Sequence, residues 1–239
     1  EEAAGPTSVS GIPLDPDAKF GGILQIFDDA EGPSNSTWEE AAGSGFFAMQ
    51  PLHSSLIRPQ SWGGLEEYQN NAFFNFQPDL AESWSASEDG KTWTFKLREG
   101  LVWSDGTPLT SADIKWSYDT IITGECLNRS PRAVQFLAVD NITTPDDVTV
   151  VFNLKHAKAA ILEVIGMPYH IMRPKHVYEG TDCEALRKEI PDVIQGPFSI
   201  TEWIPGEKYV FEKRDDYWNQ PLPYLDGLNL NMLSRSAAP

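Results

Sequence analysis

The sequence predicts a mixed α/β protein, because strand-like and helix-like segments alternate along its 239 residues. Between Asp89–Gly90 and Asp105–Gly106, apolar and polar residues alternate with the two-residue period of a half-buried strand, and Asp-Gly pairs favour tight turns. The segment from Thr110 to Gly124 starts like a capping box, with Asp113 three residues after Thr110. A hairpin that leads into a capped helix is therefore expected.

The first third of the chain predicts a flexible lead, one strand and one helix. Residues 1–19 are acidic, rich in small residues and without apolar periodicity, which is typical of a flexible segment. An apolar strand is expected over Gly21–Phe27, followed by a loop rich in Asp, Gly, Pro and Asn. A helix is expected from Trp38 to about Leu56, and residues 57–84 are expected to mix turns and short aromatic strands.

The rest of the chain continues the alternation and shows no internal repeat. A strand is expected over Val148–Leu154, and short helices are expected to end at Gly166 and before Pro191. A second hairpin and a last alternating strand follow, at Phe198–Trp203, Lys208–Lys213 and Leu228–Leu233, with the hairpin turning at Pro205–Gly206.

Composition and charge exclude some classes of protein. The hydrophobic content of 41% and charged content of 22% are typical of a globular protein, in one large domain or two ordinary ones. With 35 acidic and 18 basic residues the formal net charge is −17, which opposes binding to nucleic acid. Cys126 and Cys183 have no metal-type spacing, so they form one disulfide or remain two buried thiols.

Two blocks of sequence resemble the family 5 extracellular solute-binding proteins, the dipeptide-, oligopeptide- and nickel-type receptors of ABC importers. Residues 77–119 carry Pro-x-Leu-Ala-x-Ser-Trp and two Asp-Gly motifs around Thr-Phe-x-Leu-Arg-x-Gly. Residues 196–230 carry Gly-Pro-Phe, Trp-x-Pro-Gly, Asp-Tyr-Trp and Tyr-Leu-Asp, and a Pro-Lys-His segment lies between the blocks. The order and spacing of these motifs are similar to the family's.

The resemblance implies a periplasmic-binding-protein-like clamp of type II, with two lobes that trap a solute between them. Residues 20–50 and 165–239 then correspond to the first lobe, and residues 51–164 to an extra α/β domain inserted in it. The second lobe is missing from a chain of this length. In this arrangement the Trp-rich hairpin and capped helix stiffen the extra domain, and their tryptophans pack in its core.

Candidate solute contacts are placed by strand ends and by the resemblance. In open α/β sheets, ligands lie at the carboxyl ends of the strands. Four places are candidates for solute contact: the loop after the first strand, the residue before the Gly-Pro motif, the end of the last strand and the Met-Pro-Tyr segment. These candidates are Asp28, Asp29, Glu31, Gly32, Trp38, Tyr169, Gln195, Asn231 and Met232.

Three other kinds of function find less support. Five residues separate His170 from His176, and the sequence has no Cys-His cluster. This spacing disfavours metal or metallophore binding. No Gly-x-Ser-x-Gly motif is present, and Gly43–Ala48 fits the dinucleotide pattern only inside an expected helix, which disfavours an enzyme. Eight tryptophans suggest a carbohydrate-binding module, but they alternate in strands as packing residues do.

The sequence therefore predicts a receptor that captures peptides outside the membrane and delivers them to an ABC permease. It is expected to catalyse no reaction, to need no cofactor, to bind no nucleic acid and to act as a monomer. The expected location is the cell envelope, periplasmic or extracellular, with a lipid anchor on the full-length precursor. Oligosaccharide is the alternative solute within the same family, and nickel or a metallophore is a more distant one.

Overall fold

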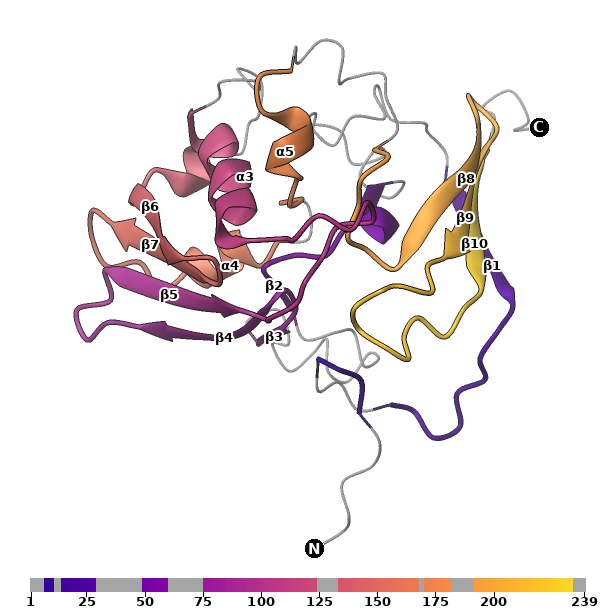
Figure 1. The fold of residues 1–239 in the computed structure, drawn as a ribbon, viewed down its shortest axis with the longest axis horizontal. Coiled ribbons are helices and arrows are strands. Elements are labelled where there is room, and N and C mark those ends of the chain that lie inside the picture. The colour runs from indigo at the N-terminus through magenta and orange to yellow at the C-terminus, as the bar shows by residue number, and fades with distance from the viewer. Residues whose placement is uncertain are drawn as a thin grey trace, which may run out of the picture.

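A computed structural model describes residues 7–10, 14–28, 49–59, 75–123, 133–167, 170–181 and 191–233. Within these residues the chain forms two four-stranded sheets and one two-stranded sheet (Figure 1). The two four-stranded sheets lie toward opposite sides of the molecule (Figure 1). The longest described helix, α3, packs beside the sheet that contains β5. The expected α/β class is therefore what the structure shows.

The first sheet has the strand order β4-β5-β7-β6, and all of its neighbouring strands are antiparallel. Its strands are β4 (Ala81–Ala86), β5 (Thr92–Leu97), β6 (Val139–Asp146) and β7 (Thr149–Leu154). The hairpin between β4 and β5 turns at the predicted Asp-Gly pair, where Gly90 has a φ of +66° that favours glycine.

The two-residue period of β5 and β7 gives this sheet its buried face. Phe95 and Leu97 of β5 are buried, and Val150, Phe152 and Leu154 of β7 alternate with partly exposed neighbours. β6 was not predicted, because its sequence VDNITTPD is mostly polar and contains a proline. It pairs with β7 through two register shifts, so the partner strand rather than its own pattern makes it a strand.

Helix α3 (Ser111–Thr123) begins where the capping box predicted. The Thr110 backbone N–H donates to Asp113 Oδ2 at 2.9 Å, as the reciprocal bond of a capping box requires. Asp113 Oδ1 accepts the backbone N–H of Lys175 at 2.9 Å, at the start of α5 (Lys175–Tyr178). One carboxylate therefore fixes the beginnings of two helices.

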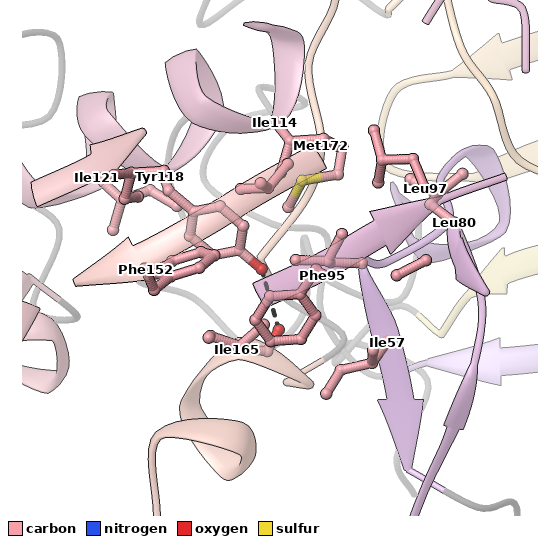
Figure 2. Packing of buried hydrophobic residues seen from close by; sticks show 14 of the residues in the cluster. Ile57, Leu80, Phe95, Leu97, Ile114, Tyr118, Ile121, Phe152, Ile165 and Met172 are labelled. Atoms are coloured by element: carbon pink, nitrogen blue, oxygen red, sulfur yellow. Dashed lines mark hydrogen bonds between the residues drawn. The ribbon is translucent and has the colours of Figure 1, made fainter. Parts of the chain in front are cut away.

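The large core lies between the first sheet, α3 and α4 (Ile161–Ile165), as Figure 2 shows. Phe95 and Phe152 meet edge to face with ring centroids 5.6 Å apart, and both are fully buried. The Tyr118 hydroxyl donates to the Ile165 carbonyl oxygen at 3.1 Å, drawn as a dashed line in Figure 2. Each such side chain contributes about 1.5–3 kcal/mol by leaving water, so this core is the main stabilising feature of its half.

The second four-stranded sheet has the order β1-β10-β9-β8. Its strands are β1 (Ile23–Asp28), β8 (Phe198–Ile204), β9 (Lys208–Lys213) and β10 (Gly227–Met232). β1 pairs with β10 in parallel, whereas β9 is antiparallel to both β8 and β10. Strands β1, β8 and β10 therefore run in the same direction and end at the same edge. The β8–β9 hairpin turns at the predicted Pro-Gly pair, where Gly206 has a φ of +73°.

A small core lies on one face of this sheet, and the described chain passes from one core to the other at several places. Leu52 packs in the small core and Leu56 in the large one. Ile171 packs in the small core and Met172 in the large one. The small core consists of Met49, Leu52, Ile171, Ile194, Phe198, Tyr209, Phe211, Leu228 and Leu230. The division into a first lobe (residues 20–50 and 165–239) and an extra domain (51–164) stays a prediction; Leu52 packs in the small core, and Ile165, Met172 and Tyr178 pack in the large one.

The helix that was predicted to reach Leu56 ends earlier, so its end was predicted wrongly. Met49 is helical, the short 3-10 helix η1 (Gln50–Leu52) follows, and residues 53–56 are not helical. Pro51 has no backbone N–H to continue an α-helix, and β2 (Ile57–Pro59) starts directly afterwards by pairing with β3 (Phe76–Pro78). A second 3-10 helix, η3, spans Ala133–Phe136.

Some predicted features lie outside the described residues. These are the helix before Pro191, the stop at Gly124, the greater part of the first helix, and both Cys126 and Cys183. Part of the expected flexible lead is described, and it contacts the body of the protein: Ser8 and Ser10 are buried, and the Val9 N–H donates to the Gln220 carbonyl oxygen at 3.1 Å.

Candidate functional site

The carboxyl ends of β1, β8 and β10 form one edge of the second sheet, which we call the carboxyl edge. It comprises Phe27, Asp28, the turn at residues 204–207 and residues 231–233. The Leu233 N–H donates to the Asp28 carbonyl oxygen at 2.7 Å, and the Met232 N–H donates to the Glu207 carbonyl oxygen at 2.7 Å. Backbone hydrogen bonds therefore hold three separate chain segments side by side at the place where open α/β sheets bind ligands.

The carboxyl edge carries both polar and apolar side chains. Asn231 Nδ2 donates to Gln25 Oε1 at 3.1 Å and to the Ile26 carbonyl oxygen at 3.3 Å, so the amide has a defined orientation. Phe27 and Leu233 keep 62% and 53% of their surface exposed, although both are large apolar residues. Such an edge can offer hydrogen-bonding groups to a backbone-like ligand and apolar surface to its side chains.

Three predicted contacts come together here, and five cannot be placed. Asp28, Asn231 and Met232 lie on adjacent parallel strands with Asp28 directly opposite Met232. Phe27 and Leu233 were not predicted, although their places at strand ends could have indicated them. The five candidates outside the described residues are Asp29, Glu31, Gly32, Trp38 and Tyr169, and they stay predictions.

Gln195 lies at the other edge of the sheet. It precedes β8, which spans seven residues, or roughly 23 Å at 3.3 Å per residue. Its side chain is 2% exposed, and Nε2 donates to the Ser54 carbonyl oxygen at 3.1 Å and to the Met172 carbonyl oxygen at 3.4 Å. Gln195 therefore joins segments of the protein itself, and the structure does not bring it together with the carboxyl edge.

The amide of Gln195 also determines which ring nitrogen of His53 carries the proton. Because Nε2 faces two carbonyl groups, Oε1 faces His53 Nδ1 at 3.0 Å, and Nδ1 must be the protonated ring nitrogen. Burial lowers the pKa of His53 to about 3; the hydrogen bond with Gln195 acts in the opposite direction, and the Arg173 charge lowers the pKa further. His53 is thus a neutral imidazole that supports Gln195.

The edge at which β8 and β10 begin, which we call the junction edge, faces the large core. Gly196 N–H donates to the Leu52 carbonyl oxygen at 2.8 Å. Buried Arg214 donates from Nη1 to the carbonyl oxygens of Ile194 and Gly196 at 3.3 and 3.0 Å. The start of the Gly-Pro motif therefore forms hydrogen bonds with other segments of the protein at the junction edge.

A buried carboxyl group lies at the same junction. Asp79 is 4% exposed, and its Oδ2 accepts the Ser55 backbone N–H at 2.9 Å. Burial raises the pKa of Asp79 to about 6, against the opposing effects of Arg58, the Ser55 hydrogen bond and Arg98. A raised carboxyl pKa is common at functional sites, but this group is enclosed by structural elements and distant from the carboxyl edge.

Elsewhere in the described chain we looked for a cavity that could hold a ligand and for a cluster of metal-ligating side chains. A cavity of about 720 Å³ lies between α3, β6 and the end of α5, and none of the predicted contacts lines it. His170 is fully buried, and His176 Nε2 lies 2.8 Å from Asp105 Oδ2. In the described ranges, no three His, Cys, Asp or Glu side chains gather as metal ligands. Nor do those ranges contain a helix long and apolar enough to cross a membrane.

The two four-stranded sheets and α3 form part of a mixed α/β protein, and comparison with known proteins specifies the family. Residues 75–239 match the family described as bacterial extracellular solute-binding proteins, family 5 Middle. The match covers more than half of the chain, so the chain belongs to this family, as the sequence motifs predicted.

Individual relatives agree with this assignment. The chain is 27% identical over 174 residues to the dipeptide-binding protein DppE of Bacillus subtilis, covering 66% of this chain and 31% of that protein. It is 28% identical over 217 residues to a probable peptide-binding protein, YejA, of Agrobacterium fabrum, covering 84% and 34%. The chain thus spans about a third of the length of these curated relatives.

Solved structures show the same fold. The oligopeptide-binding protein AppA of Bacillus subtilis, in complex with a nonapeptide, superposes with a TM-score of 0.76 at 21% identity, covering 91% of this chain and 41% of that one. The periplasmic binding protein DppA of Helicobacter pylori, in complex with the peptide STSA, gives 0.74 at 23% identity, covering 90% and 43%. The expected type II periplasmic-binding-protein fold is therefore confirmed for this part of the clamp.

Proposed function

We propose that this chain forms one lobe of a receptor that captures peptides outside the membrane for an ABC importer. The observation that carries the proposal is the parallel arrangement of β1, β8 and β10, which brings Asp28, Asn231 and Met232 to one edge. Relatives of known name bind dipeptides or oligopeptides, and their family is extracellular.

The proposed mechanism involves binding and closure without a chemical reaction. A peptide bound at the carboxyl edge would stabilise the closed state of a two-lobed protein, because that state offers it contacts on both sides. A permease in the membrane would then recognise the closed receptor. A monomer in the periplasm or at the cell surface, tethered by a lipid on the precursor, fits this role. Neither oligosaccharide nor nickel is favoured by an observation on these residues.

The proposal is tested by thermal unfolding of a full-length protein that contains this chain, with short peptides, oligosaccharides and nickel chelates as separate additives. A peptide that binds only the folded receptor should add about 2.7 kcal/mol of stability at 100 times its dissociation constant. A shift with sugars or nickel alone would overturn the peptide assignment.

Variants separate the two edges of the sheet. Asn231→Ala should weaken peptide affinity severalfold with little change in the unfolding temperature of the free protein, because its amide is largely at the surface. Gln195→Ala should lower that temperature and leave the affinity nearly unchanged, since Gln195 binds only protein groups in the described structure. The reverse pattern would place the solute at the junction edge.

A further inference from the structure

Residues 7–10, which we call the strap, run across the loop that connects β9 to β10. Val9 N–H donates to the Gln220 carbonyl oxygen at 3.1 Å, and Ser10 N–H donates to Asn219 Oδ1 at 2.8 Å. The hydroxyl oxygens of Ser8 and Ser10 lie 3.0 Å apart, and these residues are only 4% and 9% exposed. The strap is thus an ordered part of the junction edge.

Arg98, just after β5, holds the strap from the other half of the molecule. Its Nη1 and Nη2 donate to the carbonyl oxygens of Val9 and Ser10 at 3.4 and 3.5 Å, and its Nε donates to the Asp79 carbonyl oxygen at 2.8 Å. The strap therefore bonds to the β9–β10 loop of the second sheet and, through Arg98, to the end of a strand of the first. The distances to the strap are long, so Arg98 holds it less firmly than it holds Asp79.

Beneath the strap lies a polar cluster whose hydrogen bonds are incomplete. Asp79 Oδ1, Asn219 Nδ2, and the Nε and Nη2 of Arg58 are buried without a hydrogen-bond partner within the described structure. Asp79 and Asn219 are 4% and 1% exposed. Buried polar groups without partners oppose the closed arrangement, and opening gives water access to Asn219, which bonds directly to the strap.

We propose that the strap is a lid that opens and closes over this polar cluster, and that in the closed position it ties the two halves of the molecule together. Opening releases the bonds of Val9 and Ser10, admits water to Asn219, and frees the loop at residues 214–226. The strap lies at the junction edge, so this inference does not depend on where the solute binds.

Hydrogen–deuterium exchange on truncated chains tests the lid. Removal of residues 1–10 deletes the strap, and removal of residues 1–6 is the matched control that keeps it. In the longer truncation, amides of residues 214–226 should exchange about tenfold faster or more, because the loop loses the hydrogen bonds that it accepts from Val9 and Ser10 and opens more often. Amides of β5 and β7 should exchange at the same rate in both chains. Arg98→Lys in the full chain should show the same local acceleration in weaker form, since lysine lacks the guanidinium fork.

Two results would overturn the proposal. Equal exchange of residues 214–226 in both truncated chains would mean that the strap holds nothing. Acceleration spread equally over β5, β7 and the loop would mean that residues 7–10 belong to the cooperative fold and do not open as a separate lid. A circular-dichroism melt of each truncated chain shows whether the two sheets remain folded while exchange is compared.

Discussion

The guanidinium carbon of Arg98 lies 5.0 Å from the centre of the Trp218 ring. Arg98 belongs to the first motif block that resembles the family, and Trp218 belongs to the second. The contact joins the end of β5 to the loop between β9 and β10, so two motifs from opposite halves of the chain meet where the halves adjoin. A cation above an indole ring contributes about 0.5–1 kcal/mol when it is partly exposed.

This contact predicts a measurable coupling between the two residues. Arg98→Lys should destabilise the chain by about 1–2 kcal/mol, because charged hydrogen bonds to three carbonyl groups are weakened or lost. In a double-mutant cycle with Trp218→Leu, the coupling should be about 0.5–1 kcal/mol by urea denaturation. The pair Lys213 and Phe20, 6.0 Å apart, is the matched comparison and should show a smaller coupling. Additive effects of Arg98→Lys and Trp218→Leu would contradict the prediction.

Gly196→Ala should destabilise the chain by about 1–3 kcal/mol, as overpacking does. A Cβ atom at this position would lie 2.2 Å from the Leu52 carbonyl carbon and 2.3 Å from the His53 nitrogen, and backbone atoms cannot turn aside. Gly180→Ala is the control, since it has a φ of +79° but nothing within 4 Å of an added Cβ. Chemical denaturation should rank Gly196→Ala as the more damaging change, and the opposite ranking would show that the junction adapts easily.

The raised pKa of Asp79 predicts that the folded chain loses stability as the pH rises from about 4 to 6. Its pKa is raised from 3.8 to about 6 in the folded chain, so the folded state binds the proton more tightly than the unfolded state. The contribution is fully present below pH 4 and lost above pH 6, and it amounts to about 3 kcal/mol. Asp79→Asn should abolish this component in urea titrations at several pH values. An unchanged pH profile in the variant would show that the carboxyl group is ionised without cost.

The lowered pKa of His53 predicts a pH dependence of stability with the opposite sign. Its pKa is lowered to about 3, so the folded state keeps the imidazole neutral and its contribution is lost as the pH falls from 6.5 toward 3. The two groups therefore partly cancel between pH 4 and 6 in the unmodified chain. Asp79→Asn should leave stability that increases with pH, and His53→Gln should leave stability that decreases with pH. His156→Gln, at an exposed position, is the control for the general effect of replacing a histidine by glutamine.

Local sequence patterns predicted most of the described strands and the main helix. The Asp-Gly and Pro-Gly turns and the Thr110–Asp113 cap depend on neighbouring residues, whose conformational preferences do not require a partner far along the chain. β6 was missed and the helix toward Leu56 was extended too far, because pairing with β7 and β3 decided those segments. Pairing partners distant in sequence leave no trace in local periodicity.

The candidate site shows the same division. Asp28, Asn231 and Met232 were chosen because they end strands, and the parallel pairing of β1 with β10 places them together. Gln195 was chosen from its place before a prominent motif, and the antiparallel order β10-β9-β8 puts it at the opposite edge. The direction of each strand, which a sequence motif does not encode by itself, separates the two cases.

By itself the sequence determined the family, because the order of its motifs carries that information. It also determined the α/β class and the turns and cap that delimit the hairpins and α3, because these depend on short-range chemistry. Only the tertiary structure decided which strand ends meet, why Gly196 must lack a side chain, and how Arg98, Trp218 and the strap join the two halves. The physical reason is that burial and hydrogen bonding act between groups that approach each other only after the strands have paired.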